Sequence, residues 1–381
     1  MKRILHLCNY TWETGGPPSV IYGHAKVQKD YNIEQHIFSS PHKNQTIYNQ
    51  TNNQRLFVFK ISILNKILPD FSWQLILFFL KNKSKYDYIN SHGLWNLGSI
   101  LPYIIPNRAK KIITLHGFLD DYVLNKSAIS KKIFWYIIQK WCLKKADIIH
   151  VISKNELEFV RKNFNYLDKK LVYIPNGLSF EQVTDEVDMV FKDTIDEVLN
   201  STDIVFLYLG RLNIKKGLDL LLPAFVEFKR LSKLKSKLLI VGPDDGYKST
   251  IQQFINKHST ETDSILLFDP VRGSEKDYLL KKCHVFVLPS YSEGFSIAAL
   301  EAIANGIPGI YSDTIGFAED IKENLAGLIC DLNVGSIVEQ MHLLCNDSVL
   351  REKIKKNGID LFTNNYKIEI VAKNYIEQIL L

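Results

Sequence analysis

The chain has 381 residues, of which 46% are hydrophobic and 23% are charged. These fractions are typical of ordinary globular proteins and exclude a disordered or fibrous chain. The length suffices for two domains, each of which can bury a sizeable core. No apolar run approaches the roughly 20 residues that a membrane-spanning helix needs.

The cysteines and the N-terminal residues indicate the cellular compartment of the protein. The five cysteines are odd in number and contain no Cys-x-x-Cys pair. We therefore expect reduced, mostly buried thiols in a cytoplasmic protein rather than a disulfide framework. The first ten residues have too short an apolar part for a signal peptide, and they predict a first strand instead.

Charge divides the chain into a basic part and an acidic part. Residues 1–180 contain 25 Lys and Arg against 11 Asp and Glu, a net charge of +14, and the remaining residues carry −8, which together give the formal +6. The basic half suggests an anionic partner: membrane lipid, nucleic acid or a phosphorylated substrate. As an alternative to binding such a partner, any single lysine could simply lie on a solvent-exposed helix face.

In chain order, short apolar runs alternate with longer helical patterns. The first run covers residues 3–8 and precedes a helix from about Ser19. Further runs cover 86–92, 110–117, 146–153 and 171–177 in the first half, and 203–211, 236–243, 264–270, 284–290 and 307–312 in the second. Apolar strands separated by helices predict parallel sheets that are covered on both faces.

This order predicts an α/β protein with two doubly wound, Rossmann-like domains. The first domain covers residues 1–180, an acidic connection without strand character covers 181–202, and the second domain covers 203–365. We expect a final helix at about 366–381 to pack back on the first domain.

Residues that can bind ligands follow several of the predicted strands. Ligands of open α/β sheets bind beyond the carboxyl ends of the strands. The segments at that position are Ser91–Gly93, His116–Gly117, Gly210–Arg211, Gly242–Pro243, Val271–Gly273 and Pro289–Phe295. Six such segments predict a shared cleft between the two domains.

The segment Ser290–Ile310 contains two glutamates that are eight residues apart. We expect a turn at Glu293–Phe295, in which Gly294 can adopt a positive φ. A helix from about Ile297 to Asn305 follows, with Ser296 as its N-cap, and a glycine and a proline then end it. The N–H groups at the start of this helix and the positive end of its dipole favour an anion.

An acidic residue inside this apolar helix needs a partner. Glu301 lies about one and a half turns from the start, where an unpaired carboxylate is costly. A ribose with two vicinal hydroxyls would satisfy it, with the attached phosphates at the start of the helix. Glu293 could then accept hydrogen bonds from a second sugar. The alternative is that Glu301 pairs with a lysine and that Glu293 caps a helix.

The segment L-G-R-L-N-I-K-K-G-L favours the ligand interpretation. Arg211 follows a strand end beside Gly210, and Lys216 comes five residues later, before Gly217 and a new helix. Arginine offers a planar fork to phosphate oxygens, and lysine offers a point charge. Two cations and one helix N-terminus would neutralise a diphosphate without a metal. We interpret Asp244–Asp245 as a turn rather than a metal site.

These motifs resemble those of the retaining nucleotide-sugar glycosyltransferases of family 4, which have the GT-B fold. The E-x7-E pattern spans Glu293–Glu301, the phosphate loop G-R-L-x-x-x-K-G spans Gly210–Gly217, and the G-G-P-P loop after the first strand spans Gly15–Pro18. The segments T-L-H-G-F-L-D-D-Y and S-H-G-L-W are similar to a subgroup that builds bacterial surface polysaccharides. The resemblance covers essentially the whole chain.

The resemblance implies a role for each matching residue. Arg211 and Lys216 would bind the donor diphosphate, and Glu301 would hold the ribose. Glu293 would contact the donor sugar, which His116 would approach from the first domain; these two and the two cations are the candidate catalytic residues. The other donor-binding residues would be Gly16, Gly210, Gly242, Val271, Arg272, Gly294, Phe295, Ser296 and Ile297.

The chain departs from the family pattern at two positions. Ser296 replaces the last glycine of the common E-G-F-G, and Gly309 stands where a branched residue is usual. Both departures bear on the choice of donor rather than on the reaction.

The implied reaction depends on electrostatics more than on acid–base chemistry. Departure of a nucleoside diphosphate leaves negative charge on the β-phosphate, which Arg211, Lys216 and the helix N-terminus would stabilise. The family's reaction retains the anomeric configuration, and we expect no metal or other cofactor. His116 is the titratable group that we assign to the donor sugar; a histidine satisfied by backbone is the alternative. A role for His92 stays open.

Two segments of mixed aromatic, aliphatic and lysine residues could explain the basic half. They are Ile63–Lys85 and Ile133–Lys145, and both have the composition of interfacial helices. The alternative is two core helices with solvated ends. The resemblance implies a lipid-linked saccharide acceptor, for which peripheral contact with the anionic cytoplasmic face of the inner membrane would be suited.

The resemblance therefore implies a hexosyltransferase that moves a hexose-type sugar from a UDP- or GDP-sugar to a growing, lipid-linked bacterial polysaccharide, such as O-antigen, capsule or exopolysaccharide. Alternatives on the same fold are a sugar-nucleotide epimerase, or a phosphorylase with a lysine for a pyridoxal cofactor. A non-catalytic nucleic-acid-binding protein is suggested only by the basic half, and no known nucleic-acid motif occurs.

Overall fold

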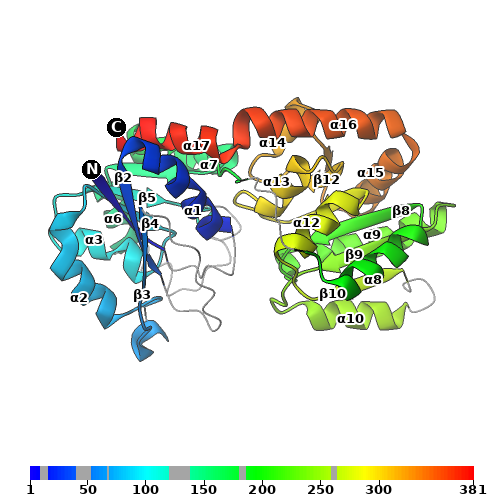
Figure 1. Cartoon of the computed structure of the whole chain (residues 1–381), viewed down its shortest axis with the longest axis horizontal. Helices are drawn as coiled ribbons and strands as arrows, with labels where there is room; N and C mark the ends of the chain where they lie inside the picture. Colours follow the sequence, from blue (N-terminus) through cyan, green and yellow to red (C-terminus); the bar gives the residue numbers. More distant parts are fainter. Residues whose placement is uncertain (9–15, 40–52, 67, 120–137, 180–185, 259–263) are drawn as a thin grey trace. The chain divides into compact units, whose positions relative to one another are not determined.

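The computed structural model describes residues 1–8, 16–39, 53–66, 68–119, 138–179, 186–258 and 264–381. Two compact units divide the chain: unit 1 contains residues 1–179 and 366–381, and unit 2 contains residues 180–365. Each unit has one parallel sheet with helices packed against it (Figure 1). The prediction of two doubly wound α/β domains is confirmed.

Unit 1 is built on a seven-stranded parallel sheet in the order β3-β2-β1-β4-β5-β6-β7. The strands are β1 Lys2–Leu7, β2 Ile33–Ser39, β3 Gln54–Val58, β4 Tyr88–His92, β5 Lys110–Thr114, β6 Ile148–Val151 and β7 Leu171–Tyr173. In the register of the central strands, His6 of β1 is paired with Asn90 of β4, and His92 of β4 with Thr114 of β5. Since all the strands are parallel, their carboxyl ends lie along one edge of the sheet.

Helices cover both faces of this sheet. The helices of unit 1 are α1 Gly16–Gln28, α2 Trp73–Asn82, α3 Leu101–Ile104, α6 Lys140–Lys145, α7 Lys154–Asn163 and α17 Ile368–Tyr375. Ile4 of β1 packs in a cluster with Tyr375 of α17, and α1 packs beside α17. The next residue, Leu5, points to the opposite face and packs in a cluster with Phe79 of α2. Each such buried side chain contributes about 1.5–3 kcal/mol.

Residues 366–381 complete unit 1 after the chain has passed through unit 2. Leu178 forms a parallel bridge with Lys367. The ammonium group of Lys2 and the hydroxyl of Tyr88 both donate to the carbonyl oxygen of Leu380, each at 2.6 Å. The segment is therefore tied to the first strand and to the centre of the sheet.

Unit 2 is built on a six-stranded parallel sheet in the order β10-β9-β8-β11-β12-β13. The strands are β8 Ile204–Leu209, β9 Ser236–Val241, β10 Ile265–Phe268, β11 Val285–Leu288, β12 Gly309–Ser312 and β13 Leu328–Cys330. The helices are α8 Met189–Asn200, α9 Leu218–Leu231, α10 Lys248–Lys257, α12 Gly273–Lys282, α13 Ile297–Ala304, α14 Ala318–Glu323, α15 Val334–Asn346 and α16 Ser348–Leu361. Because β8 and β11 are neighbours, the loops that follow them start side by side.

Some elements differ from the sequence-based prediction. β2, β3 and β13 lie outside the predicted apolar runs; β2 escapes the pattern because Glu34, Gln35 and His36 are polar although they are buried. The predicted connection 181–202 contains α8, which belongs to unit 2 and buries Ile195 and Val198; its residues 181–185 lie outside the described part. The five cysteines are free, and four of them are buried, as predicted.

Candidate functional site

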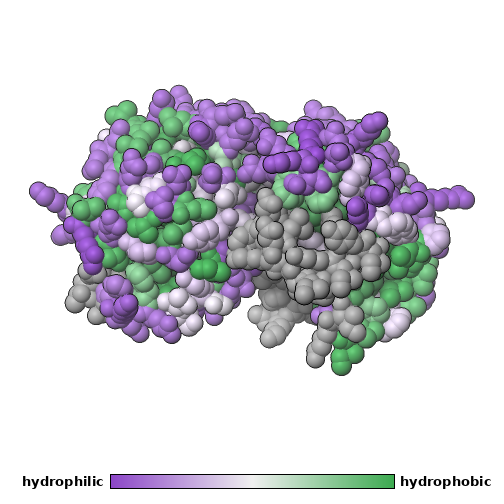
Figure 2. All heavy atoms as spheres, turned by 180° about the vertical axis from the view of Figure 1, so that it is seen from behind, coloured by the Kyte–Doolittle hydropathy of each residue, from purple (hydrophilic) through white to green (hydrophobic). Residues whose placement is uncertain are grey.

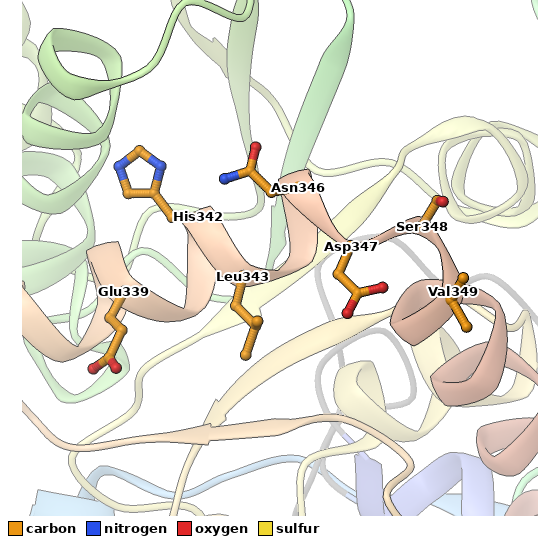
Figure 3. A pocket seen from close by; sticks show the side chains of 7 residues that line it. All are labelled: Glu339, His342, Leu343, Asn346, Asp347, Ser348 and Val349. Carbon is orange, nitrogen blue, oxygen red and sulfur yellow. The ribbon is translucent and has the colours of Figure 1, made fainter.

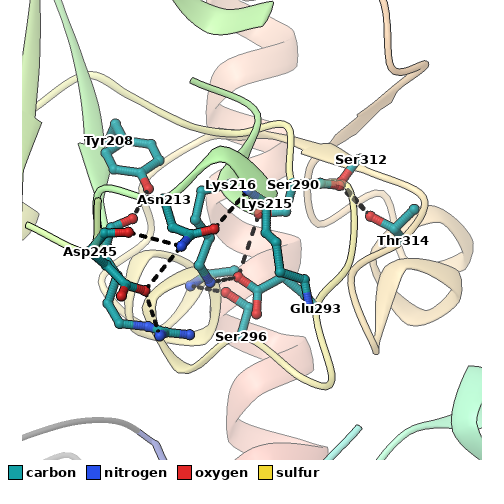
Figure 4. A network of polar contacts seen from close by, with 12 residues as sticks. Tyr208, Asn213, Lys215, Lys216, Asp245, Ser290, Glu293, Ser296, Ser312 and Thr314 are labelled. Atoms are coloured by element: carbon teal, nitrogen blue, oxygen red, sulfur yellow. Dashed lines mark hydrogen bonds and ion pairs between the residues drawn. The ribbon is translucent and has the colours of Figure 1, made fainter. Parts of the chain in front are cut away.

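The candidate site of unit 2 forms where the chain leaves β8 and β11. After β8 the chain passes through Gly210–Asn213 and a 3₁₀ turn, Ile214–Lys216, before α9 begins. Gly217 adopts a left-handed backbone with φ +70°, and a Cβ there would lie 1.8 Å from the carbonyl oxygen of Pro289. Glycine alone permits this approach, which brings the loop after β8 against the loop after β11 (Figure 4).

Two polar contacts join these loops. The backbone N–H of Tyr291 donates to the carbonyl oxygen of Lys215 at 2.7 Å. The ammonium group of Lys216 forms an ion pair with the carboxylate of Glu293 (Figure 4). These two side chains are only 15% and 11% exposed. The structure therefore brings together two residues that the sequence assigns to different parts of a donor.

Arg211 lies in the same loop but is more exposed. Its Nη1 contacts Oδ2 of Asp245 at 2.8 Å, and both side chains are largely in solvent. The side-chain amide of Asn213 also donates to Asp245, to its carbonyl oxygen at 3.0 Å and to its Oδ2 at 3.2 Å. Asp245 was predicted only as part of a turn, and nothing in its spacing from Arg211 indicates this pair.

Asp244 forms the predicted turn. Its Oδ1 accepts hydrogen bonds from the backbone N–H groups of Gly246, Tyr247 and Lys248, at 2.9 to 3.2 Å. The N–H of Lys248, followed by the other two, lowers the pKa of the Asp244 carboxyl group. Asp244 thus stabilises the start of α10.

Tyr208 supports the loop Gly210–Gly217, and sequence reasoning did not identify this residue. Its hydroxyl donates to the carbonyl oxygen of Arg211 at 2.8 Å. Burial, followed by the nearby charge of Glu293, raises the pKa of Tyr208 well above its ordinary value. The hydroxyl therefore remains a neutral hydrogen-bond donor that fixes the loop backbone.

The start of α13 follows the prediction in all but one detail. The hydroxyl oxygen of Ser296 accepts from the backbone N–H of Ala299 at 3.4 Å, and the helix runs from Ile297 to Ala304. The left-handed residue is Ser296, with φ 74°, and not Gly294, so that expectation was wrong. Phe295 is buried, with its ring centroid 4.8 Å from that of Phe317, and this packing anchors the turn.

Glu301 has a lysine partner. Oε1 of Glu301 lies 2.6 Å from Nζ of Lys276, which belongs to α12. This contact is the alternative that the sequence left open for Glu301. Lys276 was not singled out because it lies 25 positions away in sequence and looks like an ordinary solvated helix lysine.

The remaining predicted donor-binding residues of unit 2 are spread along the same edge. Gly242 has φ +155°, and a Cβ there would lie 1.8 Å from the carbonyl oxygen of Gly210, so the ends of β8 and β9 approach closely. Val271 and Arg272 lie between β10 and α12, and Arg272 is the N-cap position of that helix. Because β10 is the edge strand, these two residues start two strands away from Lys216.

His116 lies at the end of β5 in unit 1, in a constrained backbone. Both His116 and Gly117 are left-handed, with φ 56° and 76°. A buried carboxylate holds this turn: Oε1 of Glu156 accepts from the N–H of Gly117 at 2.7 Å, and its Oε2 accepts from the N–H of Ile152 at 3.1 Å. A left-handed histidine is uncommon and costs free energy, which the surrounding contacts offset. The sequence contains no local signal for Glu156.

His92 contacts His116 directly. Nδ1 of His92 lies 2.8 Å from Nε2 of His116, and the two rings are stacked with their centroids 5.1 Å apart. Burial lowers the pKa of His116 to about 3 and holds the pKa of His92 well below its ordinary value. Both imidazoles are therefore neutral at pH 7.

Gly16 is the first residue of α1. Residues 9–15, which include the first glycine of the G-G-P-P loop, lie outside the described residues, as do residues 120–137 after the T-L-H-G-F-L segment. The predicted approach of Gly16 to a ligand therefore stays a prediction.

The segment Ile63–Lys85 forms an exposed apolar surface. Trp73, Leu77 and Leu80 of α2 are exposed, as is Ile63, while Leu75 and Phe79 on the other side of the helix are buried. Apolar side chains gather around α2 in the space-filling view (Figure 2). In the second such segment, residues 133–137 lie outside the described residues; in α6, Trp141 is exposed, and Cys142 and Leu143 are buried.

A hollow of about 620 Å³ lies on α15 and the start of α16 (Figure 3). Its lining residues are Glu339, His342, Leu343, Asn346, Asp347, Ser348 and Val349. None of the predicted site residues is among them. We therefore define the site by the charged and polar side chains at the strand ends, where anion-binding chemistry is concentrated.

Two further observations limit what the described residues can do. Within the ranges that the structure describes, no group of three or more His, Cys, Asp or Glu side chains could hold a metal ion. In those same ranges, every helix is too short or too polar to cross a membrane.

Two family models match the chain. The model described as "Glycosyl transferases group 1" matches residues 191–361, and the model described as "Glycosyltransferase Family 4" matches residues 14–182. The two matches cover nearly all of unit 2 and most of unit 1.

Similar proteins extend over most of the chain. The capsular polysaccharide biosynthesis glycosyltransferase CapM of Staphylococcus aureus is 25% identical over 359 residues, 92% of this chain and 90% of that protein. A UDP-Gal:alpha-D-GlcNAc-diphosphoundecaprenol alpha-1,3-galactosyltransferase of Escherichia coli is 24% identical over 310 residues, 79% of this chain and 77% of that protein. Anabaena HepE, solved in complex with UDP-glucose, matches with a TM-score of 0.78 and 15% identity over 100% of both chains.

Proposed function

Because this chain belongs to glycosyltransferase family 4 and has the GT-B fold, we propose that it moves a hexose-type sugar from a UDP- or GDP-sugar to a lipid-linked bacterial polysaccharide, with retention of the anomeric configuration. The contact between Lys216 and Glu293 is the observation that carries this proposal. It joins, at one sheet edge, a cation suited to phosphate and an anion suited to sugar hydroxyls.

Relatives support the proposed substrates. CapM is named for capsular polysaccharide biosynthesis, and the E. coli relative is named for a UDP-Gal donor and a diphosphoundecaprenol-linked acceptor. HepE was solved with UDP-glucose bound. We extend these substrate classes to this chain because its strand-end cations suit a nucleoside diphosphate.

The ion pairs of unit 2 suit exchange with a diphosphate. The exposed pair of Arg211 with Asp245 is of a kind that contributes only about 0–1 kcal/mol, whereas a hydrogen bond to a charged phosphate is typically worth about 1.5–3 kcal/mol. A diphosphate would therefore displace Asp245 from Arg211. When it also takes Lys216, Glu293 is released to accept hydrogen bonds from the hydroxyls of the donor sugar.

Glu301 would hold the ribose. Its contact with Lys276 engages Oε1 and fixes the orientation of the carboxylate at 2.6 Å. A carboxylate has four lone-pair positions, so a lysine and two ribose hydroxyls can share it. Gly242, Val271 and Arg272, at the ends of β9 and β10, would line the base.

The chemical step would follow from stabilisation of the leaving group. The bond between the anomeric carbon and the β-phosphate oxygen breaks, and the negative charge on that oxygen is stabilised by Arg211, Lys216 and the start of α13. The acceptor hydroxyl forms the new bond on the same face, and the leaving phosphate takes its proton. These groups neutralise the diphosphate without a metal, so we expect transfer to survive EDTA.

The exposed face of α2 would bring the enzyme to its lipid-linked acceptor. Trp73 is 59% exposed, and Leu77 and Leu80 follow at helical spacing. Lys81 and Lys85 lie at the end of this segment in solvent. Apolar side chains beside lysines favour an anionic lipid surface. We therefore propose peripheral contact with the cytoplasmic face of the inner membrane, and no nucleic-acid partner.

Thermal shift with UDP-, GDP- and ADP-sugars tests the donor, because a ligand that binds the folded state raises the melting temperature. The best donor is then incubated with a polyprenyl-diphosphate-linked saccharide, and the product is examined by NMR for its anomeric configuration. We expect an α-linked product from an α-linked donor. An inverted product, no donor binding, or a new sugar epimer formed without acceptor would each contradict the proposal.

A further inference from the structure

A row of polar side chains crosses the sheet of unit 1, and all but the partly exposed His116 are buried. Its members are Gln54 of β3, Gln35 of β2, His6 of β1, His92 of β4 and His116 after β5, on five neighbouring strands. Successive members are hydrogen-bonded: Gln54 to Gln35 at 2.9 Å, Gln35 to His6 at 3.1 Å, His6 to His92 at 2.8 Å, and His92 to His116 at 2.8 Å. The row ends at the residue that we assign to the donor sugar.

One backbone carbonyl fixes the direction of the first hydrogen bond. The nitrogen Nε2 of Gln35 lies 3.1 Å from the carbonyl oxygen of Ile21, which can only accept. The amide oxygen of Gln35 accepts from the amide of Gln54. Gln35 must therefore present an N–H, and not its oxygen, to Nε2 of His6. Nε2 of His6 is consequently an acceptor.

The direction of this first hydrogen bond fixes the directions of the hydrogen bonds between the three imidazole rings. A neutral imidazole has one N–H and one acceptor nitrogen. Because Nε2 of His6 accepts, its Nδ1 carries the proton and donates to Nε2 of His92; Nδ1 of His92 then donates to Nε2 of His116. His116 must therefore carry its own proton on Nδ1. With the opposite tautomers, two N–H groups would face each other between Gln35 and His6.

Burial keeps the three rings neutral, so each of them carries a single N–H. It lowers the pKa of His6 and of His116 to about 3, and the pKa of His92 lies well below its ordinary value. The neighbouring titratable groups are His24 and His150, which would oppose a positive charge on these rings. The carboxylate of Glu156 is bound to the N–H groups of Gly117 and Ile152 in the same region.

The histidines of the polar row lie near the carboxyl ends of β1 and β4 and just after β5. On the same face, toward the start of the strands, Ile4, Tyr88 and Ile112 form an apolar cluster with α17. Apolar residues therefore pack well on this face of the sheet. A row of buried polar side chains has a higher free-energy cost than such packing. Polar residues replace this packing at His6, His92 and His116, whereas Gln35 and Gln54 lie earlier in β2 and β3.

We propose that Gln35, His6 and His92 are positioning residues that lock His116 in the Nδ1–H tautomer. This inference rests on the proposed function and on the contact between His116 and the donor sugar that the family resemblance implies. Nε2 of His116 is engaged by His92, so this nitrogen cannot act as a general base toward the sugar.

Nitrogen NMR of the whole chain with ¹⁵N-labelled histidine tests this directly, because the two tautomers give distinct nitrogen signals. We expect His116 to carry its proton on Nδ1 between pH 6 and pH 8, with signals assigned from single-histidine variants. A proton on Nε2, a mixture of tautomers or a charged ring at pH 7 would overturn the proposal. This result depends on neither activity nor the identity of the donor.

Two matched glutamine variants test whether Gln35 determines the tautomer of His116. In Gln35→Met, the fixed donor to His6 is lost, so His116 should become a mixture of tautomers. In Gln54→Met, the carbonyl of Ile21 still orients Gln35, so His116 should keep Nδ1–H. A folded Gln35→Met protein with an unchanged His116 signal overturns the role of Gln35. If this variant does not fold, the measurement on the unsubstituted chain still decides the tautomer.

Kinetics connect the tautomer to the reaction. With the donor found by thermal shift, Gln35→Met should reduce kcat about tenfold or more, while the affinity for the free nucleoside diphosphate stays unchanged. A purely structural role would lower the melting temperature and leave the kcat of the folded fraction unchanged. If the unsubstituted chain transfers no sugar from any donor, the proposed function fails, but the NMR result stands by itself.

Discussion

The carboxyl ends of the two sheets carry different kinds of polar group. In unit 2, Lys216 with Glu293 and Arg211 with Asp245 are charged pairs, and the second pair is largely exposed. In unit 1, His92 and His116 are neutral rings joined by a directional hydrogen bond. The charged groups of unit 2 satisfy one another without a ligand, and these pairs can exchange a partner for an incoming anion, which the neutral rings of unit 1 cannot.

This difference teaches how electrostatic work is divided in the protein. Under the proposed function, the charges that would meet phosphate are held in pairs whose partners can be displaced at small cost. The groups that would meet an uncharged sugar are oriented in advance and prevented from ionising, which would cost no reorganisation when the ligand arrives. The predictions below test this contrast, from the largest expected effect to the smallest.

Acid should unfold unit 1 before unit 2. The pKa of His6, His24 and His116 is about 3 in the folded chain against 6.5 when exposed, so the unfolded state binds more protons below pH 6.5. Stability is then fully present above pH 6.5 and falls by about 1.4 kcal/mol per pH unit for each such histidine as the pH drops toward 3. Tryptophan fluorescence reports this unfolding, since all five tryptophans belong to residues 1–179.

His24→Phe sharpens that measurement. Nε2 of His24 is buried without a hydrogen-bond partner among the described residues, and its ring lies 5.0 Å from that of Tyr375. The variant should lose less stability between pH 7 and pH 5 than the unsubstituted chain does. Equal acid sensitivity, or loss of circular dichroism before loss of fluorescence, would show that the histidines do not set the order of unfolding.

Lys216→Ala should have a double effect in unit 2. It leaves the poorly exposed carboxylate of Glu293 without its partner, which should lower the free energy of unfolding by about 1–3 kcal/mol. Affinity for UDP or GDP should fall on the order of 10- to 100-fold. Urea unfolding and calorimetry measure the two effects.

The double variant Lys216→Met, Glu293→Met separates stability from binding. It removes both charges, so most of the lost stability should return. Diphosphate affinity should remain low because the cation is still missing. Restored affinity in the double variant would exclude Lys216 as a phosphate ligand.

Glu301→Gln and Glu293→Gln should affect different steps, the first nucleotide binding and the second sugar transfer. The first should weaken binding of the free nucleotide several-fold, on the order of 1 kcal/mol, because a ribose partner is impaired. The second should leave nucleotide affinity nearly unchanged but reduce the transfer rate, because its partner is the sugar in the transition state. If both variants lose thermal stability and neither changes affinity or rate, the two acids serve only the architecture.

Arg211→Ala should change binding with little effect on stability. Its pair with Asp245 is exposed, so unfolding should change by less than about 0.5 kcal/mol. Arg161→Ala is the matched control, since Arg161 contacts Asp168 at the same kind of exposed site, at 2.9 Å. Diphosphate affinity should fall in the first variant alone, and an equal fall in both would point to non-specific charge.

Local signals in the sequence were enough for much of the fold and for parts of the site. The boundaries of α13 could be predicted because Ser296 caps it and a glycine and a proline end it. The position of the loop Gly210–Gly217 could be predicted because these two glycines mark the end of a strand and the start of a helix. Strands with apolar runs were found for the same reason.

Long-range partners could not be predicted in this way. Lys276 and Asp245 are polar helix and turn residues whose contacts with Glu301 and Arg211 depend on packing between distant elements. The link from Gln35 to His116 requires the strand order β3-β2-β1-β4-β5, and β2 and β3 lack the apolar pattern that reveals a strand. The positive φ of Ser296, where glycine was expected to take it, could not be predicted because serine rarely adopts this conformation.

The return of residues 366–381 to unit 1 has a consequence for how the protein is made. During translation at about 5–20 residues per second, the ribosome needs roughly 10–40 s to add unit 2 after residue 179 is complete. Throughout that interval the sheet face around Ile4 and Ile112 lacks the α17 side chains that cover it. The nascent first half therefore exposes an apolar surface to which a chaperone can bind. Unit 1 can complete its folding only after residues 366–381 have been synthesised.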